Sequence, residues 1–376
     1  MTHQDSTKNH DYDAVIIGGG CAGLSLARRA HQLPYKTLAV IEPKDKKQDH
    51  AWGIFPNSET YDALAMARKT WAHWQIITPK GAVTQTSHDR PYACLESKAW
   101  LSHCREQARA HGVDLITGQV TDIELNAHAN SITTDHGQIT TGQIFDSRPN
   151  PIPKGMMIQH FIGHEIQVSR PVFDPETAIL MDFRCDQSRG IHFIYVLPFS
   201  ATQALVESTL FSPQIEDNAF YETAISAYLE EYYGITEKIT LRREQGAIPM
   251  GFMPEDHSTG LPIGGRGGAI RPSSGYAFGF IQKQIAHVMS HLKSGEMPQQ
   301  MTPHQAIDLW MDRIFLKVIR NQPQLAPRLF HAMGKALNGD EMARFMTGDA
   351  DYLLRLKVIM AMPKYPFLKA LIKGGG

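Results

Sequence analysis

The chain has 376 residues, of which 42% are hydrophobic and 20% charged, and its formal net charge is -1. This length predicts two or three domains with ample material for a core, and the balanced charge argues against a nucleic-acid partner, which would require a clustered basic surface. The four cysteines are scattered without a Cys-x-x-Cys pair, which is typical of a reduced compartment and indicates neither a disulfide framework nor a metal site.

The chain opens on a strand, a glycine-rich turn, a helix and a second strand. An apolar run over 14–17 leads into the segment Gly18-Gly-Gly20-Cys-Ala-Gly23, and the second run, 37–41, ends in Glu42. This is the dinucleotide-binding fingerprint: the first glycine permits the tight turn, the second lets backbone approach a pyrophosphate, and the third lets the helix pack on the strand. The acidic residue can accept hydrogen bonds from both ribose hydroxyls. We therefore expect the dinucleotide to be bound by Gly18, Gly20, Gly23 and Glu42.

The rest of the first 150 residues continues this domain. Apolar residues at helical spacing predict a helix over 96–111, a strand follows over 113–116, and a hairpin is expected to turn at 135–137. Lysine-rich residues 43–49 predict a solvated surface loop.

The middle third predicts an antiparallel meander. Three short runs rich in aliphatic and aromatic residues, 178–184, 191–197 and 205–211, are separated by short loops. Because side chains alternate along a strand, Glu207 shares one face with Leu205 and Thr209.

A glycine-rich stretch over 263–276 and a helix over 277–292 return the chain to the nucleotide domain, and the last seventy or so residues read as helical. The sequence contains only one dinucleotide-binding fingerprint, which disfavours an enzyme with separate flavin and nicotinamide domains. The sequence predicts an α/β fold, a Rossmann-type nucleotide-binding domain with an inserted antiparallel sheet and a helical C-terminal region. We divide the chain into 11–150 and 258–300 for the nucleotide domain, 151–257 for the sheet domain, and 301–376 for the helices.

Four longer segments carry a family resemblance: 158–163 with 178–184, 193–200 with 204–209, 266–276, and 362–368. In these segments the chain resembles the bacterial and plant lycopene cyclases, a flavin-dependent family that makes carotenoid end rings. The resemblance implies an FAD-binding fold like that of aromatic hydroxylases and an enzyme that acts on a polyene at a membrane surface. Two departures stand out. Ser208 follows Glu207 where the family often has a second acid, and Gly264-Gly265 stands where related flavoproteins have Gly-Asp.

The implied reaction closes the acyclic ends of lycopene to β-ionone rings without net redox change. It requires an acid that is protonated at neutral pH, and a glutamic acid in an apolar strand environment meets this need because desolvation raises its pKa. The matched motif makes Glu207 this general acid. FAD is expected in its reduced form, with NAD(P)H as the external reductant, and Pro272 and Gly275 are expected to contact the flavin.

Several other residues have a structural and a functional interpretation. Aromatic residues of the matching segments are candidates for stabilising a cation, although core packing is the favoured interpretation for each of them: Phe193, Tyr195, Phe199, Phe211 and Tyr276. Asp182 and Arg184 lie on one strand face, and a structural ion pair is the favoured interpretation. His50 and Trp52 match a family His-x-Trp element and stay outside the catalytic set.

We expect neither a signal peptide nor a membrane span. The first ten residues lack an apolar core, and no apolar run of about eighteen residues predicts a membrane span. The tail 364–373 mixes lysines with large apolar residues, which suits an anionic interface. We expect a cytoplasmic protein attached peripherally to the inner face of the membrane; the sequence does not indicate its oligomeric state.

Two other functions remain open on the sequence. One is an FAD-dependent monooxygenase acting on a terpenoid or aromatic substrate, which would consume oxygen. The other is a non-catalytic FAD- or carotenoid-binding protein, for which Glu207 would be dispensable.

Overall fold

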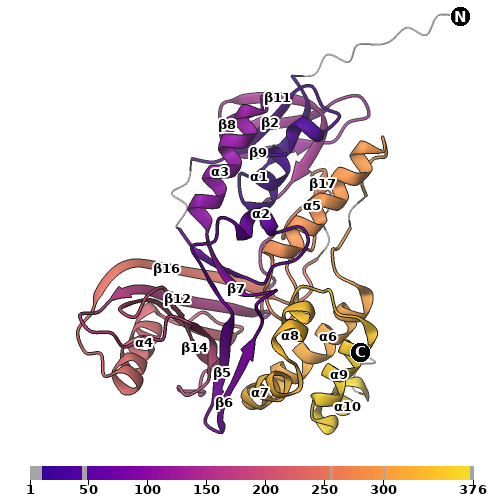
Figure 1. Cartoon of the computed structure of the whole chain (residues 1–376). Coiled ribbons are helices and arrows are strands. Elements are labelled where there is room, and N and C mark those ends of the chain that lie inside the picture. Colours follow the sequence, from indigo (N-terminus) through magenta and orange to yellow (C-terminus); the bar gives the residue numbers. More distant parts are fainter. Residues whose placement is uncertain (1–10, 45–48, 255, 257, 300, 373–376) are drawn as a thin grey trace, which may run out of the picture.

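The structure is a computed structural model that describes residues 11–44, 49–254, 256, 258–299 and 301–372 (Figure 1). The polar residues 1–10, most of the lysine-rich loop and Lys373 lie outside the described residues. The chain forms an upper body around one sheet, a lower body around a second sheet, and a group of C-terminal helices beside the second sheet (Figure 1).

The upper sheet has the strand order β8-β2-β1-β11-β10-β9, with β17 paired to β11. β1 runs parallel to β2, as the fingerprint predicts, and also parallel to β11. The helices α1, α3 and α5 belong to the same body as this sheet. Its elements are β1 (Tyr12–Ile17), α1 (Cys21–Ala27), β2 (Leu38–Glu42), α3 (Ser97–Ala110), β8 (Asp114–Thr117), β9 (Val120–Glu124), β10 (Asn130–Thr134), β11 (Gly137–Asp146), β17 (Leu261–Pro262) and α5 (Phe278–Lys293).

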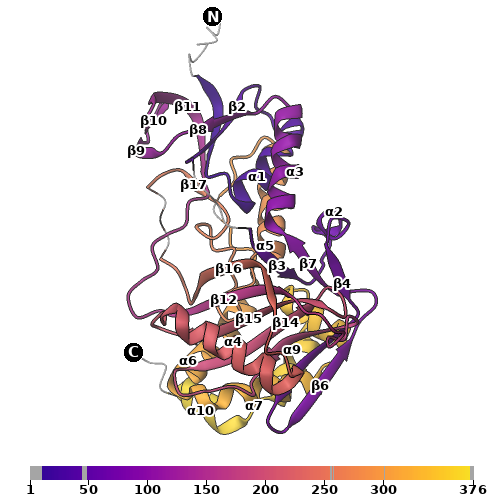
Figure 2. The ribbon, with the colours of Figure 1, turned by 90° about the vertical axis from the view of Figure 1, so that its left-hand side faces the viewer.

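The lower sheet has the order β16-β12-β15-β14-β13-β5-β6. The predicted meander is confirmed, because β13, β14 and β15 pair antiparallel in sequence order. Its elements are β5 (His73–Thr78), β6 (Gly81–Thr86), β12 (Met157–Gln167), β13 (Thr177–Asp182), β14 (Ile191–Pro198), β15 (Gln203–Ser212), α4 (Asn218–Tyr233) and β16 (Ile239–Met250). α4 covers one face of this sheet, and the C-terminal helices lie on the other side (Figure 2).

A third, three-stranded sheet of order β3-β7-β4 lies between the two bodies. It consists of β3 (Ala51–Ile54), β4 (Lys69–Trp71) and β7 (Tyr92–Glu96), and the short helix α2 (Tyr61–Leu64) precedes β4. The segment 51–86 therefore contributes to both this sheet and the lower one. The predicted domain boundaries at 150, 257 and 300 stay predictions.

The helices predicted for the C-terminal region are α6 (Ala306–Asn321), α7 (Ala326–Ala336), α8 (Gly339–Met346), α9 (Tyr352–Ala361) and α10 (Lys364–Ile372). The apolar stripe of α6 mainly packs inside, since Val318 and Ile319 are buried, whereas Trp310 is 45% exposed. No helix in the described part of the chain combines the length and apolarity needed to cross a bilayer.

Candidate active site

The three fingerprint glycines build a tight turn between β1 and α1. Gly18 has φ 100°, a conformation that favours glycine. A methyl group on Gly23 would lie 2.0 Å from the Gly18 carbonyl oxygen, so helix and turn fit only with glycine there. Gly20 is different, because nothing lies within 4 Å of the position that its Cβ would take. This open space above the turn suits a pyrophosphate; binding by these residues stays a prediction.

Glu42 ends β2 beside this turn. Its carboxylate accepts hydrogen bonds from Nε (3.1 Å) and Nη2 (3.0 Å) of Arg105 on α3. Arg105 was not anticipated from the sequence, since α3 begins far along the chain and nothing local marks its partner. A ribose bound here would share the carboxylate with this guanidinium, which holds Glu42 at the edge of the turn.

The second glycine-rich stretch closes against the first turn of α1. Gly264 has φ 66°, and a Cβ there would lie 2.6 Å from the Cβ of Ala22. Its amide donates to the Gln284 side chain at 2.7 Å. The Gly264-Gly265 pair thus occupies the neighbourhood of the nucleotide turn without offering the carboxylate of a Gly-Asp pair. The two glycine-rich segments thus pack directly against each other at Ala22 and Gly264.

The loop before α5 forms part of a cavity wall. Gly275 has φ 70°, and its amide donates to the Arg271 carbonyl at 2.9 Å. Gly275 lines the cavity together with Ser273 and Ser274, whereas Pro272 is buried and is not among the lining residues of the described chain. Of the two predicted flavin contacts, the structure therefore brings Gly275 to the cavity; neither contact is tested.

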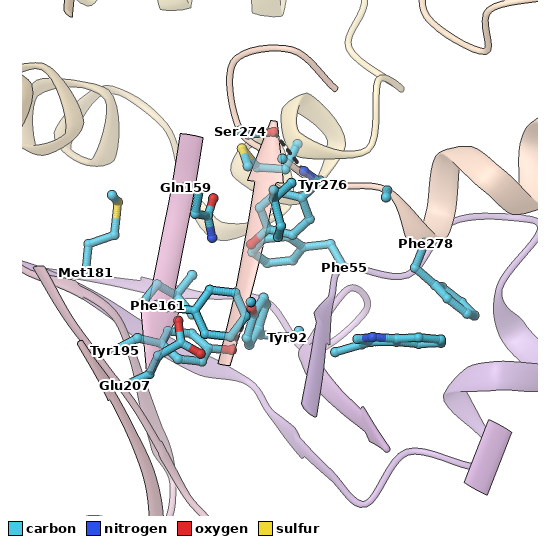
Figure 3. A pocket seen from close by; sticks show the side chains of 18 of the residues that line it. Phe55, Tyr92, Gln159, Phe161, Met181, Tyr195, Glu207, Ser274, Tyr276 and Phe278 are labelled. Atoms are coloured by element: carbon cyan, nitrogen blue, oxygen red, sulfur yellow. Dashed lines mark hydrogen bonds between the residues drawn. The ribbon is translucent and has the colours of Figure 1, made fainter. Parts of the chain in front are cut away.

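A cavity of about 510 Å³ connects the nucleotide turn with the lower sheet. Cys21 of α1 borders it at one side and Glu207 of β15 at another, while Met342 and Met346 of α8 border it from the C-terminal helices. Most of its wall is apolar. Figure 3 shows the rings of Phe161, Tyr92 and Tyr195 beside Glu207, with Phe55 and Tyr276 further along the cavity, which Phe193 also lines.

Glu207 is buried on the cavity face of β15, with 8% of the residue exposed. Its Oε1 accepts a hydrogen bond of 2.5 Å from the Thr209 hydroxyl. Desolvation by burial, and next the charge of Glu244, raise the pKa of Glu207 from 4.5 to about 8, although the Thr209 hydrogen bond opposes the shift. A carboxyl group with this pKa is mostly protonated at neutral pH. The structure thus places an acid against an apolar, aromatic-lined space.

Two tyrosines near Glu207 are joined by a hydrogen bond between their hydroxyls. The Tyr92 and Tyr195 hydroxyls lie 2.9 Å apart, and burial raises the pKa of both well above the usual value, so both stay neutral. Gly53 allows this contact, because a Cβ there would lie 1.9 Å from the Tyr92 hydroxyl and 2.6 Å from that of Tyr195. Sequence reasoning missed Tyr92, which lies on β7 in a segment without a recognised motif.

The other candidate residues divide between the cavity and the rest of the sheet. His50 and Trp52 line the cavity, as do four of the five aromatic candidates, whereas Phe199 stacks under the Arg68 guanidinium at 3.7 Å. Asp182 is fully buried, pairs with Arg184 and accepts a 2.7 Å hydrogen bond from Tyr228 of α4. This ion pair therefore belongs to the face opposite the cavity, which agrees with its structural interpretation.

The raised pKa of Glu207 predicts a pH-dependent effect on stability. An acid whose pKa is higher in the folded chain favours folding below its unfolded value, and this contribution is lost as the pH rises through the folded value. Glu207→Gln removes this dependence. We expect the variant to gain stability over the wild type between pH 4.5 and pH 8, by on the order of a few kcal/mol. Urea unfolding at both pH values checks this; a constant difference would contradict the assigned burial.

Comparison with solved structures identifies the fold. A geranylgeranyl bacteriochlorophyll reductase-like protein from Thermoplasma acidophilum has a TM-score of 0.62 at 13% identity, covering 96% of this chain and 98% of its own. A flavoprotein/dehydrogenase from Cytophaga hutchinsonii has a TM-score of 0.62 at 14% identity, covering 96% and 99%. The chain has the fold of these proteins, which confirms the predicted fold class.

Sequence comparison then identifies the family. The chain belongs to the lycopene cyclase family, because residues 13–372 match the model of the family described as lycopene cyclase protein. The lycopene beta-cyclase of Pantoea ananas is 25% identical over 390 residues, covering 96% of this chain and 97% of the relative. That of a Paracoccus species is 26% identical over 298 residues, covering 75% and 74%. The predicted family resemblance is confirmed.

Proposed function

We propose that the protein cyclises the acyclic ends of lycopene to β-ionone rings, with Glu207 as the general acid. The observation that carries this proposal is a buried carboxyl group, protonated at neutral pH, on the wall of an apolar cavity that reaches the nucleotide turn. The names of the Pantoea and Paracoccus relatives support the same activity.

The chain's own residues account for the main demands of the reaction. Glu207 protonates the terminal alkene, the resulting tertiary cation is attacked by an internal alkene, and a neighbouring proton is lost. The aromatic wall around Glu207 supplies ring faces that stabilise a cation, each by roughly 0.5–2 kcal/mol. The apolar wall also excludes water, which would otherwise capture the cation.

We include FAD as the bound dinucleotide. The Cytophaga protein with the same fold is named a flavoprotein, and the turn at Gly18–Gly23 suits the pyrophosphate of a dinucleotide. FAD in its reduced form would supply negative charge near the developing cation, with NAD(P)H as the external reductant and no net electron transfer. Equal turnover of enzyme containing oxidised and reduced FAD would contradict the reduced form.

Expression in a lycopene-accumulating bacterium tests the activity. We expect chromatography of the extracted pigments to show β-carotene in place of lycopene. Unchanged lycopene together with purified, flavin-containing protein would contradict the proposal, and oxygen uptake with an oxygenated product would instead favour a monooxygenase.

We further propose that the protein attaches peripherally to a membrane through α9 and α10. Large apolar side chains are exposed on these neighbouring helices, including Leu353 (79% exposed), Tyr365 (75%) and Ile372 (83%). Lys364 and Lys369 are exposed on α10. Apolar side chains mixed with lysines favour an anionic interface, and lycopene itself resides in a bilayer.

Introducing negative charges on these helices tests the attachment. The double change Leu353→Glu and Ile372→Glu places two anions on the proposed membrane face. We expect it to weaken binding to vesicles of anionic phospholipid by about tenfold or more, measured by co-sedimentation. Ile239→Glu, at an apolar residue of β16 that is 65% exposed, is the control and should bind like the wild type. Equal loss in both variants would contradict the assigned surface.

A further inference from the structure

A second carboxylate lies in line with Glu207 across the lower sheet. Glu207 of β15 pairs with Gly163 of β12, and Gly163 pairs in turn with Glu244 of β16. On the other side Glu207 pairs with Tyr195 of β14. Residues paired in register project to the same face, so the two glutamates flank a position that has no side chain. With strands about 4.8 Å apart, their Cα atoms are about 10 Å apart.

Gly163 lets the side chains of Glu244 and Leu205 approach the strand between the two carboxylates. A Cβ there would lie 3.1 Å from Cγ of Glu244 and 3.5 Å from its Oε1. Glu244 does not border the cavity, and only 2% of it is exposed. It lies behind the wall on which Glu207 is exposed to substrate.

Burial raises the pKa of Glu244 to about 7, but the Ala51 amide and Arg242 partly offset this shift, so its pKa stays below the value of about 8 for Glu207. Its Oε2 accepts a 2.9 Å hydrogen bond from the Ala51 amide, and the Arg242 guanidinium lies 3.9 Å away. Glu207, in contrast, accepts its hydrogen bond from the neutral Thr209 hydroxyl. When two carboxyl groups interact, the one with the donors and the cation ionises first, and its charge disfavours ionisation of the other.

Titratable groups from several neighbouring elements surround the pair. Next to Glu207 lies Tyr195 of β14, which in turn neighbours Tyr92 of β7 and Tyr276 of the loop before α5. Cys94 of β7 lies beside Glu244, and His50 lies beside Asp49 and Arg242. The charged groups near Glu244 are Asp49, Glu165 and Arg242. Beyond these, Arg68 pairs with Glu96 and Glu165. Apart from Glu244, the titratable groups next to Glu207 are neutral phenols, so Glu244 is the carboxyl group whose charge acts on Glu207 once it ionises.

We propose that Glu244 is a positioning residue whose negative charge keeps Glu207 in its acid form at the cavity wall. The inference rests on the proposed cyclisation, in which Glu207 must carry a proton before substrate binds. It also explains the Ser208 departure. Ser208 is fully buried and bonds to His192, away from the cavity. A second acid at 208 would face away from the cavity, whereas Glu244 supplies one on the same face from a different strand.

Two titrations of Glu244→Gln test this role. The first is the pH profile of cyclisation by flavin-containing enzyme, whose alkaline limb reports loss of the Glu207 proton. The second is infrared titration of the protonated carboxyl band, assigned to Glu207 by its loss in Glu207→Gln. At about 10 Å and an effective dielectric constant of about 20, removal of one negative charge lowers both midpoints by about one pH unit. Glu222→Gln is the control, because Glu222 of α4 pairs with Arg243 of β16 and its replacement should leave both midpoints unchanged.

The outcomes separate this inference from the proposed function. If the wild type fails to cyclise lycopene, the proposed function is wrong, and the infrared titration still decides whether Glu244 controls Glu207. If the wild type is active and both midpoints are unchanged in Glu244→Gln, the inference is wrong. If Glu244→Gln does not fold, Glu244→Asp replaces it: withdrawing the charge by one methylene should lower the midpoints by less, and an unchanged or higher midpoint would overturn the role.

Discussion

Replacement of Glu207 by glutamine is expected to lower kcat for lycopene cyclisation by about 10²- to 10⁴-fold, the contribution typical of a general acid. The amide has nearly the same size and can still accept the Thr209 hydrogen bond, so the cavity keeps its shape. It has no acidic proton to donate to an alkene. Turnover of purified, flavin-containing protein measures the effect, and the flavin content and the far-UV circular dichroism should match the wild type.

Ser208→Ala provides the matched control on the same strand. Ser208 faces away from the cavity and bonds to the buried His192 ring, so its loss should cost roughly 1–3 kcal/mol of stability and change turnover by less than about twofold. If Glu207→Gln retained most of the activity, Glu207 would not be the acid, and a non-catalytic role for this cavity would gain support.

Gly20→Val is expected to remove the bound flavin while leaving the protein folded. Gly20 has φ -88° and ψ -165°, which valine adopts easily, and the space above it is free of protein atoms. The new side chain would occupy the position proposed for the pyrophosphate. Losing one or two hydrogen bonds to a charged group, each contributing about 1.5–3 kcal/mol, weakens FAD binding by roughly 10- to 10⁴-fold.

Fluorescence titration of the apoprotein with FAD measures this affinity, and thermal unfolding without FAD measures the fold. Gly23→Val is the informative comparison, because its Cβ would lie 2.0 Å from the Gly18 carbonyl oxygen. That variant should lose both flavin and thermal stability. Wild-type affinity in Gly20→Val would show that the dinucleotide does not bind over this turn.

Local signals predicted much of this fold. The fingerprint, the helix α3, the hairpin between β10 and β11, and the meander β13–β15 all depend on neighbours in the sequence, and each is present in the structure. The strands β5 and β6, which form a hairpin, were not predicted, and the place of this hairpin in the lower sheet is set by the parallel pairing of β5 with β13, about a hundred residues further along the chain. No local pattern encodes such a pairing.

In the site, too, some residues are marked by local sequence signals and others are brought together only by tertiary contacts. Glu207 was found because a motif and strand alternation both mark it, and the structure places it on the cavity wall. Glu244 and Tyr92 reach it from β16 and β7, and their relation to Glu207 depends on register across several strands. Arg105 likewise meets Glu42 only through the packing of α3. Sequence spacing identifies the reacting group, whereas the groups that tune it are defined by tertiary contacts.

The central claim is that Glu207 delivers a solvent-derived proton in a cyclisation without net redox change. The most direct measurement is the mass of the product formed anaerobically in D₂O by enzyme equilibrated with D₂O before lycopene is added. We expect one non-exchangeable deuterium for each ring closed and no added oxygen. A product without deuterium, or a strict requirement for oxygen, would contradict this account of the site.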